Sequence, residues 1–218
     1  MRGRPAHPAM NMLVHLALLV SSAASVEPVA SPSLQTPVSI IAKDVSAEEV
    51  VDLLRQQGIP ISFVQLEAFG GHGRNVFITA DKKPLAGVLG ELTTQEPGYR
   101  FAVIEHRLVL FPADGRLERE IDGVAIEGRP RIRAIWAYAE LLASRFPDFA
   151  TLATMALRGR PSAPLYSDVV SLRSRATVVE HLVELLGTRE SIVFSITRSR
   201  FDTPYLSFEQ SGSGQQQP

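Results

Sequence analysis

A helix pattern followed by two short apolar strand patterns occurs twice in this chain of 218 residues. The first occurrence is "PLAGVLGELTTQEPGYRFAVIEHRLVLFP" and the second is "TVVEHLVELLGTRESIVFSITRSRFDTPYLSFE". In the first, leucines and a valine fall at helical spacing, and two strand-like runs then flank a tight turn at residues 105–107. The recurrence predicts two copies of one supersecondary unit, each with helices packed on a small sheet.

A further strand and helix precede each occurrence. In the first copy, "VSIIAKDV" reads as a strand, "SAEEVVDLLRQQG" as a helix, and "IPISFV" and "VFITAD" as two more strands. Ser46 and Glu49 have the capping-box spacing that marks a helix start, and Gly58 marks its end.

The second copy repeats this order with different lengths. "IDGVAIEG" and "DVVSLRS" read as strands, and "RPRIRAIWAYAELLASRF" reads as a helix. Thr177 and Glu180 repeat the capping-box spacing. Residues 148–164 fit a short helix or a degenerate strand. We therefore expect an α+β fold of two tandem β-α-β-β-α-β-β units, over residues 38–113 and 114–210.

The first 25 residues have the pattern of a signal peptide. Two arginines precede the apolar run "MLVHLALLV" (residues 12–20), and the small residues "SSAAS" offer a cleavage site after Ala24 or Ser25. A membrane anchor is the alternative, but the run is shorter than the roughly 18–20 residues that a spanning helix needs. We expect a flexible leader over residues 26–37, a disordered tail over 211–218, no transmembrane segment after cleavage, and a periplasmic or extracellular protein.

Composition excludes several classes of protein. The chain has no cysteine, which rules out disulfides, thiol catalysis, cysteine-ligated zinc and acylation on cysteine. Its net charge of −1 offers no overall basic field for nucleic acid. No Gly-x-Ser-x-Gly motif, phosphate loop or helical pair of histidines occurs. We expect neither a cofactor nor a metal, and expect binding in preference to catalysis.

The first copy resembles the short N-terminal domain shared by secretins and TonB-dependent transducers. The resemblance lies in "VSIIAKDVSAEEVVDLLRQQGIPISFV" and "NVFITADKKPLAGVLGELTTQEPGYRFAVIEHRLVLFP", about a third of the chain. Residues at positions typical of that family are Gly58, Thr79, Leu85, Leu89, Leu92, Gly98 and Tyr99. The resemblance implies a non-catalytic periplasmic adaptor that docks other envelope proteins or passes a signal to a membrane-bound regulator.

Two surfaces are candidates for binding a protein partner. Arg129, Arg131 and Arg133 cluster at the start of a predicted helix, where the helix dipole disfavours positive charge, and could form a basic face. Leu108 and Leu110 lie in a closing strand; if that strand or "YLSFEQ" is a sheet edge, it could accept a partner strand. Alternatively, the two copies pair their edges with each other.

A second function class is an exported hydrolase or ligand-binding protein with a site between the copies. Its candidate residues are His72 and Arg74 in the loop "FGGHGRN" and His106 at the hairpin turn. This hypothesis requires the three side chains to meet in one cleft. His181 lies beside Glu180 and Glu184 and is expected on a solvated helix face.

Overall fold

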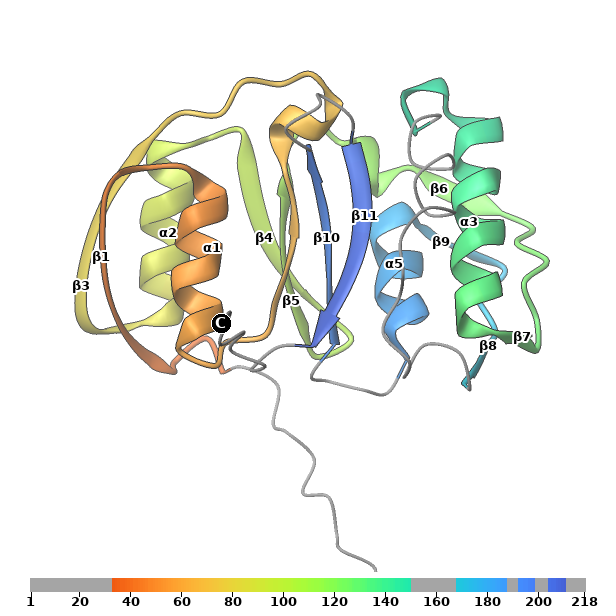
Figure 1. The fold of residues 1–218 in the computed structure, drawn as a ribbon, viewed down its shortest axis with the longest axis horizontal. Coiled ribbons are helices and arrows are strands. Elements are labelled where there is room, and N and C mark those ends of the chain that lie inside the picture. The colour runs from red at the N-terminus through yellow and green to blue at the C-terminus, as the bar shows by residue number, and fades with distance from the viewer. Residues whose placement is uncertain (1–32, 150–167, 188–191, 199–203, 211–218) are drawn as a thin grey trace, which may run out of the picture.

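The computed structural model describes residues 33–149, 168–187, 192–198 and 204–210. These residues form an α+β fold, as predicted, in which four helices pack against several small sheets (Figure 1). The first half contains β1 (Pro37–Val45), α1 (Ala47–Gln56), β2 (Ile61–Val64), the 3-10 helix η1 (Leu66–Phe69), β3 (Val76–Pro84), α2 (Leu85–Gln95), β4 (Tyr99–Ile104) and β5 (Arg107–Pro112). The second half contains η2 (Arg116–Glu118), β6 (Glu120–Asp122), β7 (Arg129–Pro130), α3 (Arg131–Arg145), η3 (Pro147–Phe149), β8 (Val169–Val170), β9 (Arg175–Thr177), α5 (Val178–Leu186), β10 (Ile192–Arg198) and β11 (Pro204–Gln210). The expected signal peptide, most of the leader, residues 150–164 and the tail lie outside the described residues.

One five-stranded sheet joins the two halves. Its order is β11-β10-β2-β5-β4, with β2 parallel to both β10 and β5, and with two antiparallel hairpins at the sides. Within this sheet, the halves meet where Phe63 pairs with Ser195 and Val64 pairs with Ile196. The two copies therefore do pair their sheets with each other.

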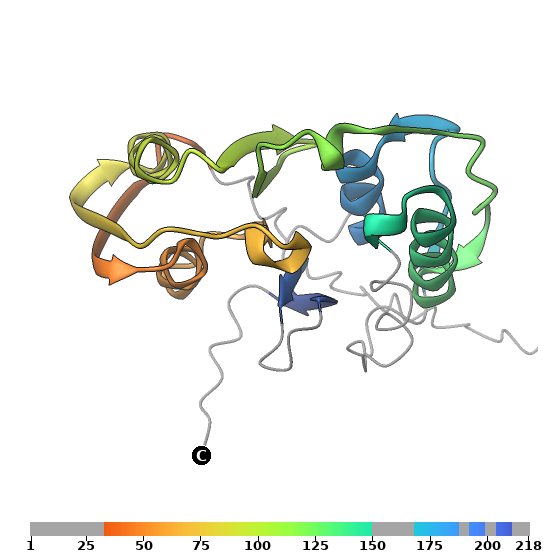
Figure 2. The ribbon, with the colours of Figure 1, turned by 90° about the horizontal axis from the view of Figure 1, so that it is seen from above.

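Each half covers one face of this central sheet (Figures 1 and 2). On one face lie α1, α2 and the outer two-stranded sheet of β1 and β3; on the other lie α3 and α5 with the short pairs β6–β9 and β7–β8. The alternation along β5 shows both layers, because Leu108 and Leu110 join one hydrophobic cluster and Val109 and Phe111 join the other.

The two halves share one local plan. The first residue of β1 pairs with the residue before α2 (Pro37 with Pro84), and the first residue of β6 pairs with the residue before α5 (Glu120 with Thr177). In both halves the hairpin starts 15 residues after that helix cap, from 84 to 99 and from 177 to 192.

A matching hydrogen bond ties the same helix to the same strand in each half. The Leu85 N–H donates to the Thr36 carbonyl at 2.9 Å, and the Val178 N–H donates to the Arg119 carbonyl at 3.0 Å. Each bond satisfies one of the amides that the start of a helix leaves free.

Both predicted capping boxes are present. The Ser46 hydroxyl accepts from the Glu49 N–H at 3.3 Å, and the Glu49 carboxylate accepts from the Ser46 N–H at 2.9 Å. Thr177 and Glu180 make the same exchange at 3.3 and 2.7 Å. These local signals explain why α1 and α5 begin where the sequence predicts.

Several boundaries differ from expectation. The strand predicted over residues 121–128 stops at Asp122, because Gly123 adopts a left-handed conformation with φ +69°. The strand leading into α5 is Arg175–Thr177, whereas the predicted residues 168–174 contribute only Val169–Val170. The hairpin turn is two residues long, with positive φ at Glu105 and His106.

Candidate interaction surfaces

The basic cluster at the start of α3 is only partly exposed. Arg129 and Arg133 are exposed, and neither forms an ion pair with any described residue. Next to them Val169, which pairs with Pro130 in the β7–β8 sheet, is 68% exposed. Two arginines and an apolar side chain therefore share one end of the molecule.

Arg131 does not belong to this surface, contrary to expectation. Its side chain is only 4% exposed and forms an ion pair with Asp168 at 3.3 Å. Its N–H donates to the Asp168 carbonyl at 2.6 Å. Its guanidinium lies against Gly187, where a Cβ would collide with it. Arg131 thus packs α3 against β8 and the end of α5.

Leu108 and Leu110 do not lie on a sheet edge, which was the condition for binding a partner strand there. Both are in β5, which runs between β2 and β4, and both side chains are fully buried. A partner cannot reach them without unfolding the first layer. The edges of the central sheet are β4 and β11, so "YLSFEQ" is the closing strand that does lie at an edge.

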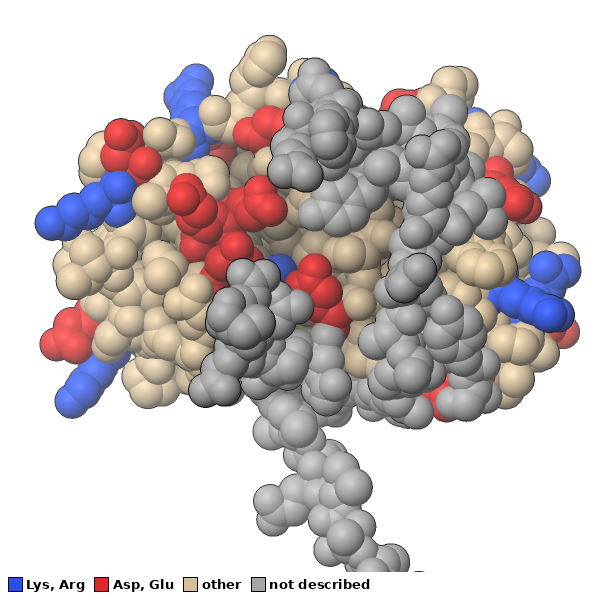
Figure 3. Space-filling model, viewed as in Figure 1, with Lys and Arg blue, Asp and Glu red and all other residues tan. Residues whose placement is uncertain are grey.

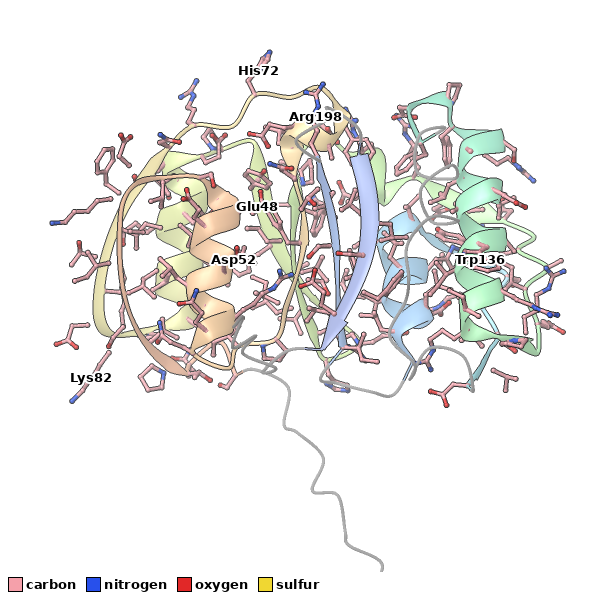
Figure 4. The ribbon with its side chains drawn as sticks, viewed as in Figure 1. Glu48, Asp52, His72, Lys82, Trp136 and Arg198 are labelled. Atoms are coloured by element: carbon pink, nitrogen blue, oxygen red, sulfur yellow. The ribbon has the colours of Figure 1, made fainter. Side chains whose placement is uncertain are left out.

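His72, Arg74 and His106 do not meet. His106 immediately precedes β5, so it lies at the end of the sheet where the parallel strand β2 starts. His72 and Arg74 follow η1, which comes after the end of β2. Figure 4 shows His72 projecting from that end of the molecule, away from the rest of the fold. All three side chains are exposed, at opposite ends of the sheet.

Carboxylates hold the loop that carries His72. The Gly73 N–H donates to Glu67 at 2.8 Å, and the Arg74 N–H donates to Glu96. The Glu96 carboxylate is buried and also accepts from the Gly98 N–H at 3.1 Å. Two of the loop's amides are therefore already occupied by internal acids, which leaves little to cradle an anion.

His181 is buried, not solvated as expected. Its Nε2–H donates to the Arg173 carbonyl at 3.1 Å, since a carbonyl can only accept, and its Nδ1 then accepts from the Tyr138 hydroxyl at 3.2 Å. Burial lowers the pKa of His181, although the Arg173 carbonyl and Glu184 oppose this effect. Burial raises the pKa of Tyr138. The neutral pair links α3 to α5.

An acidic surface over α1 was not anticipated from the sequence. Figure 3 shows acidic side chains gathered on this face, and Figure 4 shows Glu48 and Asp52 on α1. Burial, then Asp52 and Glu67, raise the pKa of Glu48. Burial also raises the pKa of Asp52, with Glu209 adding to it and Arg55 opposing it.

Arg55 ties this surface to both halves. Its Nε and Nη2 donate to the Ile61 carbonyl at 3.0 and 2.8 Å, and Nη2 also donates to the Ser195 hydroxyl at 2.8 Å. Its contact with Asp52 is a looser 3.6 Å. The arginine thus bridges α1, β2 and β10 through its hydrogen bonds, and it also lies close to the solvent-facing Asp52.

The cavity beside this surface is small. It measures about 40 Å³ and is lined mainly by polar groups, among them Ser46, Gln65, Glu67 and the buried Tyr99. Small-molecule sites typically enclose roughly 300–1,000 Å³. The cavity has room for a few water molecules at most. Across the described residues, no group of three or more His, Asp or Glu side chains could hold a metal ion.

Comparison with known proteins found no matching family model, no matching curated protein and no matching solved structure. None of the helices in the described ranges is long and apolar enough to cross a membrane.

Proposed function

We propose that this protein is an exported, non-catalytic adaptor of the cell envelope that binds a protein partner through the exposed arginines at the start of α3. The observation that carries the proposal is the exposure of Arg129 and Arg133 beside Val169, with no ion pair to either arginine in the described part of the chain.

The position of these arginines is unfavourable for the helix alone. Positive charge at a helix N-terminus opposes the dipole by about 0.3–1 kcal/mol. Among the other exposed arginines of the second half, Arg145 also forms no ion pair with any described residue, but Arg119 pairs with Asp148 and Arg175 pairs with Glu120. Arg129 and Arg133 instead keep their full donor capacity, which suits recognition of carboxylates in a partner.

Val169 adds an apolar contact to this basic surface. Arginine is enriched at protein interfaces and among the residues that carry their binding energy, and an apolar neighbour adds area that a partner can bury. The partner that fits is a protein segment that offers carboxylates to the two arginines and an apolar side chain to Val169. The N-terminal signal-peptide pattern and the resemblance of the first half to envelope adaptors support an envelope location.

The alternative of a hydrolase or ligand-binding site between the halves has no observation in its favour. The halves meet in a continuous sheet, and His72, Arg74 and His106 do not converge. We therefore do not propose it.

The test is affinity capture with the mature chain, residues 26–218, from an envelope extract of its own source, read by mass spectrometry. The double variant Arg129→Glu/Arg133→Glu should lose a partner that the wild type retains. Arg145→Glu is the matched control, because Arg145 is an exposed arginine of the same helix at its other end. Retention of the same partner by both variants, or capture of none by the wild type, would overturn the proposal.

A further inference from the structure

Glutamine side chains close both edges of the outer two-stranded sheet. On β1, the Ser39 N–H donates to Gln57 Oε1 at 3.1 Å and Gln57 Nε2 donates to the Ser39 carbonyl at 2.9 Å. On β3, Gln95 makes the same two bonds to Phe77, both at 2.8 Å. Each amide takes the place that a residue of an added strand would occupy.

The open part of each of these edges is short. The residues at alternate positions beyond the glutamine are Ile41 and Lys43 on β1, and Thr79 and Asp81 on β3. Positive φ angles at Asp44 and Lys82 then distort the strands. Amide caps, distortions and charged side chains all discourage strand addition at a sheet edge.

The β4 edge of the central sheet lacks such protection. The turn of two positive-φ residues places Ile104 and Arg107 in a hydrogen-bonded pair. Because such pairs alternate along antiparallel strands, the backbone N–H and C=O groups of Ala102 and Arg100 also point towards β5. The Gly98 carbonyl, two residues earlier, accepts from the Ala113 N–H at 2.7 Å, which agrees with this alternation.

Phe101 and Val103 therefore point their N–H and C=O groups away from β5. Neither residue has a hydrogen bond to any side chain, and no strand in the described part of the chain pairs with this edge. The Val103 side chain is 49% exposed. The opposite edge strand, β11, is flanked in the sequence by residues 199–203 and 211–218, which the structure does not describe. β4 lies within the described residues 33–149, so its edge is the one that can be analysed.

We infer that β4 is a self-association edge, at which β4 of a second copy of this chain adds in antiparallel orientation about a twofold axis at Ala102. This register pairs Phe101 of each protomer with Val103 of its partner, and it satisfies all four outward groups on each side. Tyr99 is not needed, because its N–H already donates to the Glu96 carbonyl at 3.1 Å.

We assign this edge to a second copy of the chain because β4 can itself serve as the added strand. It is an apolar strand, "YRFAVI", and the antiparallel register puts Arg100 opposite Ile104, so no like charges face each other. Phe101 of the partner would cover the exposed Val103. A twofold axis is the commonest symmetry of protein oligomers. This inference concerns a different surface from the arginines of α3 and does not depend on them.

The first test is the concentration dependence of the mass of purified mature chain, from about 1 to 200 µM, by sedimentation velocity. One strand pair buries less area than a standard interface, so we expect a dimer with a dissociation constant on the order of 10 µM. Val103→Pro should abolish it, since proline removes an outward N–H and is tolerated on edge strands. Thr79→Pro is the matched control, because it removes an outward N–H from the protected β3 edge; it should still dimerise.

A cysteine at the twofold axis tests the register independently of proline. The chain has no cysteine, so Ala102→Cys can form only an intermolecular disulfide. Residues in this type of antiparallel pair have Cα atoms about 4.5 Å apart, which a disulfide can span. Oxidation should convert Ala102→Cys, but not Thr79→Cys, into a covalent dimer. A wild type that stays monomeric throughout, a dimer that survives Val103→Pro, or equal cross-linking of the two cysteine variants would overturn the inference. The Arg129→Glu/Arg133→Glu variant should dimerise normally, which separates this result from the adaptor test.

Discussion

The two layers on either side of the central sheet differ in where their cores come from. The cluster under α1 and α2 is built entirely from residues 38–110. The cluster under α3 and α5 takes Val64, Ala68, Val109 and Phe111 from the first half. The second half therefore packs on a sheet face that the first half supplies, while the hydrophobic cluster of the first layer includes no described residue of the second half.

This difference shows how one local plan can be used in two ways. Each half pairs its first strand with the strand leading into its second helix, and each follows that helix with a hairpin. Only the first half places its own hairpin beside its own β2; the second half's hairpin is added to β2 of the first. The similarity between the halves is thus local, and both halves contribute strands to the central sheet.

The largest expected effects come from two neighbouring residues of β5. Leu110→Ala opens a cavity in the first layer and Phe111→Ala opens one in the second, and each should lower the free energy of unfolding by about 3 kcal/mol. Hydrogen exchange should separate them. Phe111→Ala should increase exchange in α3 and α5 while α1 and α2 stay protected, whereas Leu110→Ala should increase exchange in both layers. If Phe111→Ala increased hydrogen exchange equally in all four helices, the first layer would depend on the second, contrary to this expectation.

The link between the halves gives the next largest effect. Arg55→Ala removes the hydrogen bonds to the Ile61 carbonyl and the Ser195 hydroxyl, so we expect a loss of about 1–3 kcal/mol in urea unfolding. The control is Asp52→Asn, which removes the loose ion pair with Arg55 but also the repulsion from Glu209, so its stability should stay within about 0.5 kcal/mol of wild type. Equal losses in the two variants would show that the ion pair, not the bridge to β10, is what Arg55 contributes.

Local signals in the sequence predicted the parts of the fold that depend on neighbours along the chain. Both capping boxes and the hairpin from residue 99 to 112 follow from short-range chemistry, and the structure contains them. The parallel pairing of β2 with β10 joins Phe63 to Ser195, and no short-range pattern encodes a contact across that separation. From the sequence, the shared sheet could therefore be predicted only as one of two alternatives: pairing between the copies, or a free edge for a partner strand.

Three wrong expectations about candidate residues had detectable signals in the sequence. "LVLFP" in β5 is a continuous apolar run, which is typical of a strand buried on both faces and argues against an edge. Arg131 falls at helical spacing with Ile135, Tyr138 and Leu142, so it shares their buried stripe. His181 is likewise surrounded by apolar residues of α5. The acidic surface over α1 had no such signal, because Glu209 reaches it only through tertiary packing.

The two capping boxes offer a matched comparison between the layers. Ser46→Ala and Thr177→Ala each remove a side-chain acceptor at a helix start, and each should cost about 1 kcal/mol. Because the two helices lie on opposite faces of the sheet, the losses should add in the double variant. Glu49→Gln keeps an acceptor for the Ser46 N–H and should cost less. A Thr177→Ala loss well above that of Ser46→Ala would show that the second layer depends more on its helix start.

The smallest expected effect is a difference in pH response between the layers. Burial lowers the pKa of His181 from 6.5, so the unfolded chain binds a proton more readily than the folded one as pH falls through that region. Stability should therefore fall on acidification from about pH 7.5 to 5.5, and His181→Gln, which does not titrate, should remove that slope. Glu48 and Asp52 act in the opposite direction, because their raised pKa values make the folded state bind protons more readily.

For these two acids, stability should rise as pH falls from their raised folded values towards the ordinary 4.5 and 3.8. Urea unfolding of wild type, His181→Gln and Glu48→Gln at half-unit steps from pH 8 to 4 resolves the two contributions. The slope of the His181→Gln curve should differ from that of wild type as pH falls through 6.5 and below, and the Glu48→Gln curve should approach that of wild type as pH falls towards 4.5. A wild-type slope that survives in His181→Gln would place the titrating group elsewhere and would remove the buried imidazole as the acid-sensitive element of the second layer.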